Sequence, residues 1–136
     1  MKLLTDYLER KEVVLIWVAM LTAMATCASP ALAKNVRWNC VYPVVASPNG
    51  LSKEEFKLEF IADDITGKAV MVGNAGMSDV DLHVGAFGVT FSEKLTSGAV
   101  QTTTITHDGT SVHSRHTIFP DKKTMPTQYY GHCKVQ

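Results

Sequence analysis

The sequence carries no excess of charge of either sign, and this absence excludes one class of partner. Thirteen Lys and Arg residues balance thirteen Asp and Glu residues, so the formal net charge at pH 7 is zero. The basic residues form no stripe, and the acidic residues form no tail. Because nucleic-acid binding depends on concentrated positive charge, the sequence predicts no nucleic-acid partner.

Motifs of catalysis and cofactor binding are also missing. The chain has no nucleophile elbow, no phosphate-binding glycine loop, no dinucleotide fingerprint and no His-Glu-x-x-His sequence. Ser114 and His116 form the nearest approach to a Ser–His pair. In a strand these two side chains would lie about 7 Å apart, whereas a nucleophile and its base need roughly 3 Å. We therefore expect no enzyme, no catalytic residue and no cofactor.

Long apolar segments are scarce, and the most prominent one is residues 13–25. It is too short to span a bilayer comfortably, which takes about 20 residues. A charged opening precedes it and Ala31-Leu32-Ala33 follows it, an order typical of a secretory signal peptide. The sequence thus predicts a signal peptide over 1–33, a single domain over 34–136 and a periplasmic or secreted location. An uncleaved membrane anchor and lipidation at Cys27 are the alternatives.

Cysteine is rare, and only Cys40 and Cys133 lie in the predicted domain. An even number of cysteines in an exported chain indicates a disulfide bond. This bond would close nearly the whole domain into one covalent loop.

Helical periodicity is hard to find after residue 34, whereas alternation of apolar and polar residues is common. Residues 56–62, for example, alternate phenylalanine and leucine with lysine and glutamate. The pattern predicts an all-β domain of seven or eight short antiparallel strands, either an up-and-down barrel or a sandwich. A bridge between Cys40 on the first strand and Cys133 on the last favours the barrel, in which those strands are neighbours.

Three histidines and an arginine crowd the stretch THDGTSVHSRHT, residues 106–117. The Asp108-Gly109 dipeptide between two β-rich segments predicts a tight hairpin turn. A two-residue turn would pair His107 with Thr110. It would also send His113 and His116 to opposite faces, which excludes a shared metal ion and predicts no metal site.

The same register assigns roles to the two faces of this hairpin. It places His116 opposite Gln101 on the more apolar, inward face, where we expect a buried, neutral imidazole or the polar end of a ligand pocket. His113 and Arg115 then point outward, as a solvated surface or as a patch for a protein partner.

The segment Val112-His113-Ser114-Arg115-His116-Thr117, followed by Gln128-Tyr129-Tyr130-Gly131 and Cys133, resembles small exported bacterial β-proteins of uncharacterised function. The resemblance covers roughly residues 87–133. It implies export, an all-β domain and a paired Cys133, and it implies no particular activity.

These observations together predict an exported, non-enzymatic small β-barrel that binds a protein partner or a small ligand. The alternative is an inhibitor of a secreted or foreign hydrolase. For that function the loops expected at residues 47–55 and 120–126 are the candidates to enter an active site.

Overall fold

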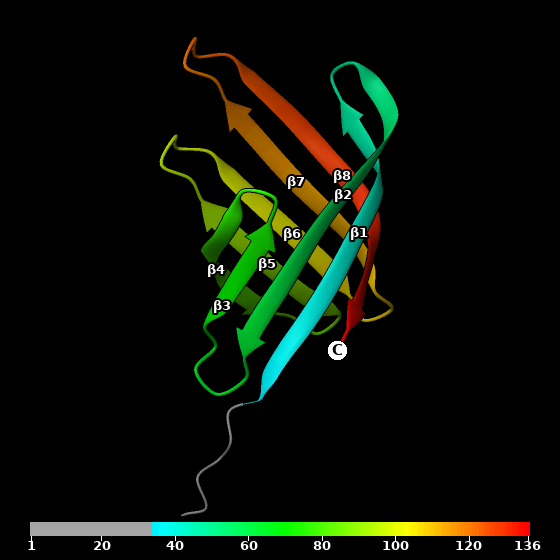
Figure 1. The fold of residues 1–136 in the computed structure, drawn as a ribbon, viewed down its shortest axis with the longest axis vertical. Helices are drawn as coiled ribbons and strands as arrows, with labels where there is room; N and C mark the ends of the chain where they lie inside the picture. Colours follow the sequence, from blue (N-terminus) through cyan, green and yellow to red (C-terminus); the bar gives the residue numbers. More distant parts are fainter. Residues whose placement is uncertain (1–33) are drawn as a thin grey trace, which may run out of the picture. The chain divides into compact units, whose positions relative to one another are not determined.

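The computed structural model describes residues 34–136, where every regular element is a β-strand (Figure 1). The eight strands are β1 (Asn35–Ser47), β2 (Gly50–Asp63), β3 (Ala69–Gly73), β4 (Gly76–Val84), β5 (Gly88–Lys94), β6 (Val100–Thr106), β7 (Thr110–Ile118) and β8 (Thr124–Val135). No helix of a length and apolarity suited to crossing a membrane occurs in this part of the chain. The predicted signal peptide and Cys27 lie outside the described residues.

The strands form a closed up-and-down barrel. Each strand pairs antiparallel with the next one in sequence, and β8 returns to pair with β1. This topology confirms the predicted barrel and excludes the sandwich. Because neighbouring connections alternate between the two ends, the β1–β2, β3–β4, β5–β6 and β7–β8 turns share one end, which we call the mouth.

The predicted disulfide joins the first and last strands. Cys40 and Cys133 are directly opposite each other in the β1–β8 ladder, with their Cα atoms 4.0 Å apart. Both residues are buried. The bond therefore links the two strands that would otherwise be the free edges of the sheet.

The alternation seen in the sequence sets the barrel interior. On β2, Leu58 and Phe60 are buried, whereas Lys57 lies on the outer face. The ring of Phe60 stacks on Phe91 of β5, with centroids 4.3 Å apart. A hydrophobic core thus fills the middle of the barrel and joins strands from opposite sides.

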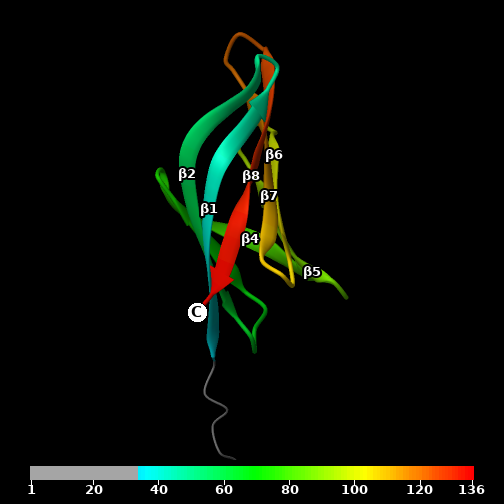
Figure 2. The same cartoon turned by 90° about the vertical axis from the view of Figure 1, so that its right-hand side faces the viewer.

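Pro43 marks an irregularity in β1. The pairing of β1 shifts register beside this residue on both the β2 side and the β8 side. Proline has no N–H to donate to a ladder, so it is tolerated at such a break. Opposite it, Gly131 leaves no room for a side chain, because a Cβ atom would lie 2.1 Å from the carbonyl oxygen of Val41. The strands β1 and β2 bend along their length before they reach their turn at the mouth, as a bulged strand is expected to do (Figure 2).

The hairpin between β6 and β7 turns at Asp108-Gly109 as predicted, but its loop has three residues rather than two. Ile105 pairs with Ser111, which leaves residues 107–109 between Thr106 and Thr110. The N–H of Gly109 donates to the carbonyl of Thr106 at 2.9 Å, and Gly109 has φ 88°. This is the common three-residue loop in which glycine takes the left-handed conformation.

Relative to the prediction, the extra loop residue exchanges the inward and outward faces of β7. Gln101 pairs with Arg115 rather than with His116. Because side chains alternate along a strand, a slip of one residue exchanges the two faces. The prediction that His113 and His116 point to opposite sides is confirmed. The prediction that His116 is buried is wrong, since His116 is exposed and His113 is buried.

Candidate functional site

A cavity of about 450 Å³ opens at the mouth of the barrel. Its volume falls at the smaller end of the roughly 300–1,000 Å³ typical of ligand sites. The wall combines residues of strands β2 to β8 with the β3–β4 turn. The strands of the closed sheet therefore bring together residues that are far apart in the sequence.

The floor of this cavity is aromatic and aliphatic. Phe56 and Tyr129 come from β2 and β8, and their ring centroids are 4.6 Å apart. Leu58 and Met71 extend the apolar surface across β2 and β3. These four residues offer a surface for an apolar body, and the aromatic pair is suited to stacking against a ring.

His113 lies within this floor, with 1% of its surface exposed. Its Nδ1 is 2.7 Å from the hydroxyl oxygen of Thr103, while its Nε2 has no hydrogen-bond partner among the described residues. The rings of Phe56, Tyr129 and Tyr42 surround the imidazole, with centroids 5.5, 5.8 and 6.1 Å from its own. An N–H beside an aromatic ring is tolerated better than a lone pair, which favours a proton on Nε2 and a hydrogen bond from Thr103 to Nδ1.

The surroundings of His113 keep it neutral. Burial is the largest effect, and with the nearby charge of Arg115 it lowers the pKa of His113 from 6.5 to about 4. The carboxylate of Glu93 opposes this shift without cancelling it. The floor of the cavity is thus uncharged at neutral pH, because burial disfavours the imidazolium.

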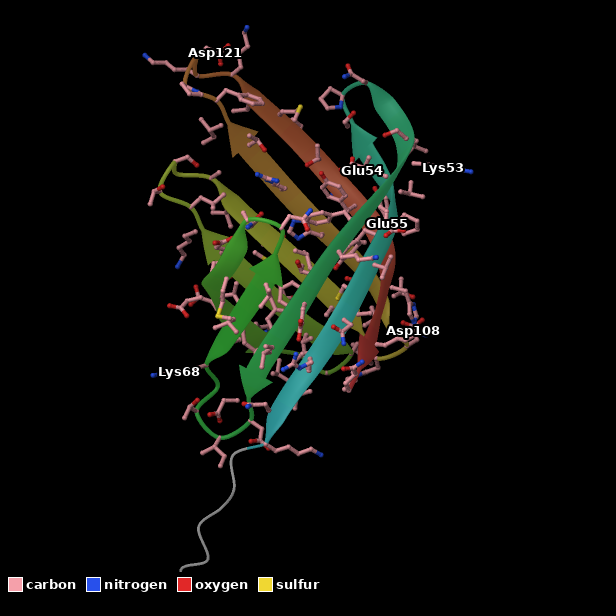
Figure 3. All side chains as sticks on the ribbon, in the orientation of Figure 1. Lys53, Glu54, Glu55, Lys68, Asp108 and Asp121 are labelled. Carbon is pink, nitrogen blue, oxygen red and sulfur yellow. A yellow bond between two sulfur atoms is a disulfide. The ribbon has the colours of Figure 1, made fainter. Side chains whose placement is uncertain are left out.

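Charged groups surround the entrance above this floor. Arg115 of β7, Glu93 of β5 and Glu54 of β2 all line the cavity. The side-chain amide of Gln101 donates a hydrogen bond to Glu93. In Figure 3, Glu54 lies on β2 along the wall near the mouth. The site therefore combines an apolar interior with a polar rim, an arrangement that orients amphipathic ligands.

Of the four residues predicted as binding sites, three line the cavity and one does not. Gln101, expected inside, lines the cavity, and so do His113 and Arg115, which were expected on the outer face. His116 is exposed on the outer face, and the structure does not bring it to Gln101. The physical cause is the three-residue loop, which assigns the even and odd positions of β7 to the opposite faces from those expected.

Sequence reasoning did not identify the floor residues as part of a site. The alternation at Phe56 and Leu58 shows that they face inward, but it does not show which end of the barrel stays open. That depends on side-chain volume at each level. Near the mouth the β3–β4 turn lines the cavity with two glycines and an alanine, Gly73, Gly76 and Ala75, beside Asn74.

The opposite end of the barrel has a second hollow of about 310 Å³, lined by Trp38, Ile105 and the β6–β7 turn. Its polar side chains already have partners. His107 Nε2 is 2.9 Å from the carbonyl of Ala86, and Asp108 accepts hydrogen bonds from Thr110. The mouth cavity is the stronger candidate because some of its polar groups have no partner.

Other kinds of site find no support within residues 34–136. No three His, Cys, Asp or Glu side chains gather there as a metal site would require. Ser114 and His116 share the outer face of β7, away from the cavity. In comparisons with known proteins, no family model, no curated protein and no solved structure matched the chain.

Proposed function

We propose that this protein is an exported, non-enzymatic β-barrel that holds a small ligand in the mouth cavity. The observation that carries the proposal is the cavity itself, about 450 Å³ with an apolar floor beneath a charged rim. A closed sheet and a disulfide fix its walls, so the site is formed before the ligand arrives. Preformed sites of this kind bind without first ordering the protein.

Export is part of this proposal. The disulfide between Cys40 and Cys133 is consistent with an oxidising compartment. Together with the signal peptide expected over residues 1–33, it supports a periplasmic or secreted location.

Filling the cavity with a bulky side chain should abolish ligand binding. Gln101 and Val100 are neighbours on β6 that face opposite ways, Gln101 into the cavity and Val100 outward. We expect the wild-type protein and Val100→Trp to bind naphthylmethanol, a neutral apolar probe, and Gln101→Trp to bind none. At about 0.3 kcal/mol per non-hydrogen atom, the wild-type Kd should be on the order of 1 mM or tighter. Isothermal titration calorimetry measures it.

Ser78→Phe provides a second way of filling the cavity, from β4 on another part of the wall. Urea unfolding and circular dichroism establish that each variant is folded. If folded Gln101→Trp and Ser78→Phe both bind naphthylmethanol as the wild type does, the probe sits elsewhere and the proposal fails.

Inhibition of a hydrolase is the second candidate function. The two segments predicted for that role contribute to the β1–β2 and β7–β8 hairpins, which project at the mouth end (Figure 1). Leu51 on the first hairpin is 75% exposed, and Phe119 on the second is 41% exposed. An inhibitor acting through these side chains would keep its activity when Gln101→Trp fills the cavity, which separates the two functions.

A further inference from the structure

Arg115 is the cationic residue of the cavity lining, and no group of the described chain pairs with it. It lies on β7 two residues beyond His113, on the same inward face, and it lines the cavity at the rim. Its Cα pairs with Gln101 on β6 and Thr127 on β8, so the strand is held on both sides. The backbone at this position is therefore fixed, and the side chain reaches the entrance.

The guanidinium group of Arg115 makes no ion pair and donates no hydrogen bond within residues 34–136. The ion pairs in that part of the chain are Arg37–Glu59, Lys57–Glu55, Lys94–Asp81 and Lys123–Asp121. Glu93 lines the same cavity but accepts its hydrogen bond from Gln101. Arg115 is exposed at the rim, and none of its five N–H donors bonds to a described residue, so all five are open to a ligand.

We infer that the ligand of the proposed site is an amphipathic monocarboxylate, with its carboxylate on Arg115 and its apolar body on Phe56 and Tyr129. The inference rests on the proposed function and specifies its ligand class. The planar guanidinium matches a carboxylate in two parallel hydrogen bonds. The tilted rings of the floor favour an aromatic or similarly flat body.

The remaining charges of the rim argue against a second negative charge on the ligand. Glu54 and Glu93 line the same cavity, so a dianion such as a phosphate monoester would meet two carboxylates with only one guanidinium to offset them. A cationic ligand would be repelled by Arg115, and because Glu93 already accepts a hydrogen bond from Gln101, Glu54 would be its remaining partner. A monoanion carries half the charge of a dianion toward these carboxylates, and it pairs with the arginine.

A series of three probes with one body and three head groups tests this inference. Naphthoate, naphthylmethanol and naphthylmethylamine are titrated calorimetrically at pH 7, where the carboxylate and the amine are charged. We expect the wild-type protein to bind naphthoate roughly tenfold more tightly than naphthylmethanol, as suits a charge-assisted pair at a partly solvated rim. Naphthylmethylamine should bind most weakly.

Substitutions at Arg115 separate charge recognition from cavity binding. Arg115→Met should abolish the roughly tenfold preference for naphthoate over naphthylmethanol, measured as the ratio of the two Kd values in the same variant, and Arg115→Lys should retain part of the preference. Arg37→Met, which removes an outer-face arginine paired with Glu59, is the matched control and should leave the preference intact.

Two outcomes overturn the inference. One is a naphthoate preference that survives Arg115→Met, and the other is tightest binding of the amine by the wild type. Both leave the proposed function standing if Gln101→Trp still abolishes binding of naphthylmethanol. If the folded cavity-filling variants still bind naphthylmethanol, the proposed function itself fails.

Discussion

Reducing the Cys40–Cys133 disulfide should lower the free energy of unfolding by about 4–5 kcal/mol, the chain-entropy value for so long a loop. The two cysteines are 93 residues apart, so the bond constrains almost the whole described chain in its unfolded state. In the folded state it joins β1 to β8 along the seam that closes the barrel. The loss is a large fraction of the 5–15 kcal/mol typical of whole domains.

Urea melts of the oxidised and reduced wild-type protein measure this effect. Reduction keeps both side chains in place, so the comparison is free of the cavities that substitution creates. Cys40→Ala combined with Cys133→Ala should show a similar or larger loss and no further change on adding reductant. A loss below about 1 kcal/mol on reduction would mean that hydrogen bonds and packing alone hold the seam.

The second large effect concerns pH and His113. Its pKa is about 4 in the folded protein and 6.5 without the fold. The unfolded chain therefore binds this proton more readily, and acid favours unfolding. The contribution to stability is fully present above pH 6.5, declines as the pH falls from 6.5 to 4, and amounts to about 3 kcal/mol in total.

Urea midpoints between pH 7 and pH 4.5 test this dependence. His113→Gln should flatten most of the slope, and His116→Gln, the matched control on the exposed face, should keep it. Subtracting the His113→Gln curve removes the contributions of the acidic residues, which both proteins share. An equal slope in the wild type and His113→Gln would show that His113 does not titrate as its burial requires.

The sequence was sufficient to predict the barrel because the features that determine it are local or covalent. Alternation on β2 at Phe56 and Leu58 defines an inward face without reference to any other strand. The positions of Cys40 and Cys133 near the two ends of the domain identify the strands that meet. A structure was not needed for either inference, since each depends on chain order and side-chain period.

The candidate site was harder to predict because it depends on the register between strands. Asp108-Gly109 suits both a two-residue loop and a three-residue loop, and the choice decides whether His113 or His116 faces inward. Apolarity favoured the wrong choice. Val112 and Ile118 share a face with His116, whereas the inward face of β7 carries Ser111, His113 and Arg115.

Buried hydrogen bonds explain why that inward face can be so polar. The hydroxyl groups of Ser111 and Tyr42 are 2.9 Å apart, and Ser111 donates to the carbonyl of Thr104 at 3.0 Å. Burial raises the pKa of Tyr42 to about 12, so it stays protonated. Polar groups with partners of this kind are tolerated in a core, but the partners lie on other strands and cannot be identified from β7 alone.

The most direct test of the account is to map a bound probe onto the barrel. Amide-correlation NMR spectra of the purified protein, recorded during a titration with naphthoate, report which residues respond. The account predicts that the largest shifts occur at the cavity residues Phe56, Gln101, His113 and Arg115, with little change at the outer-face residue His116. Shifts centred on the outer face, or absent from the cavity when naphthoate is bound, would contradict it.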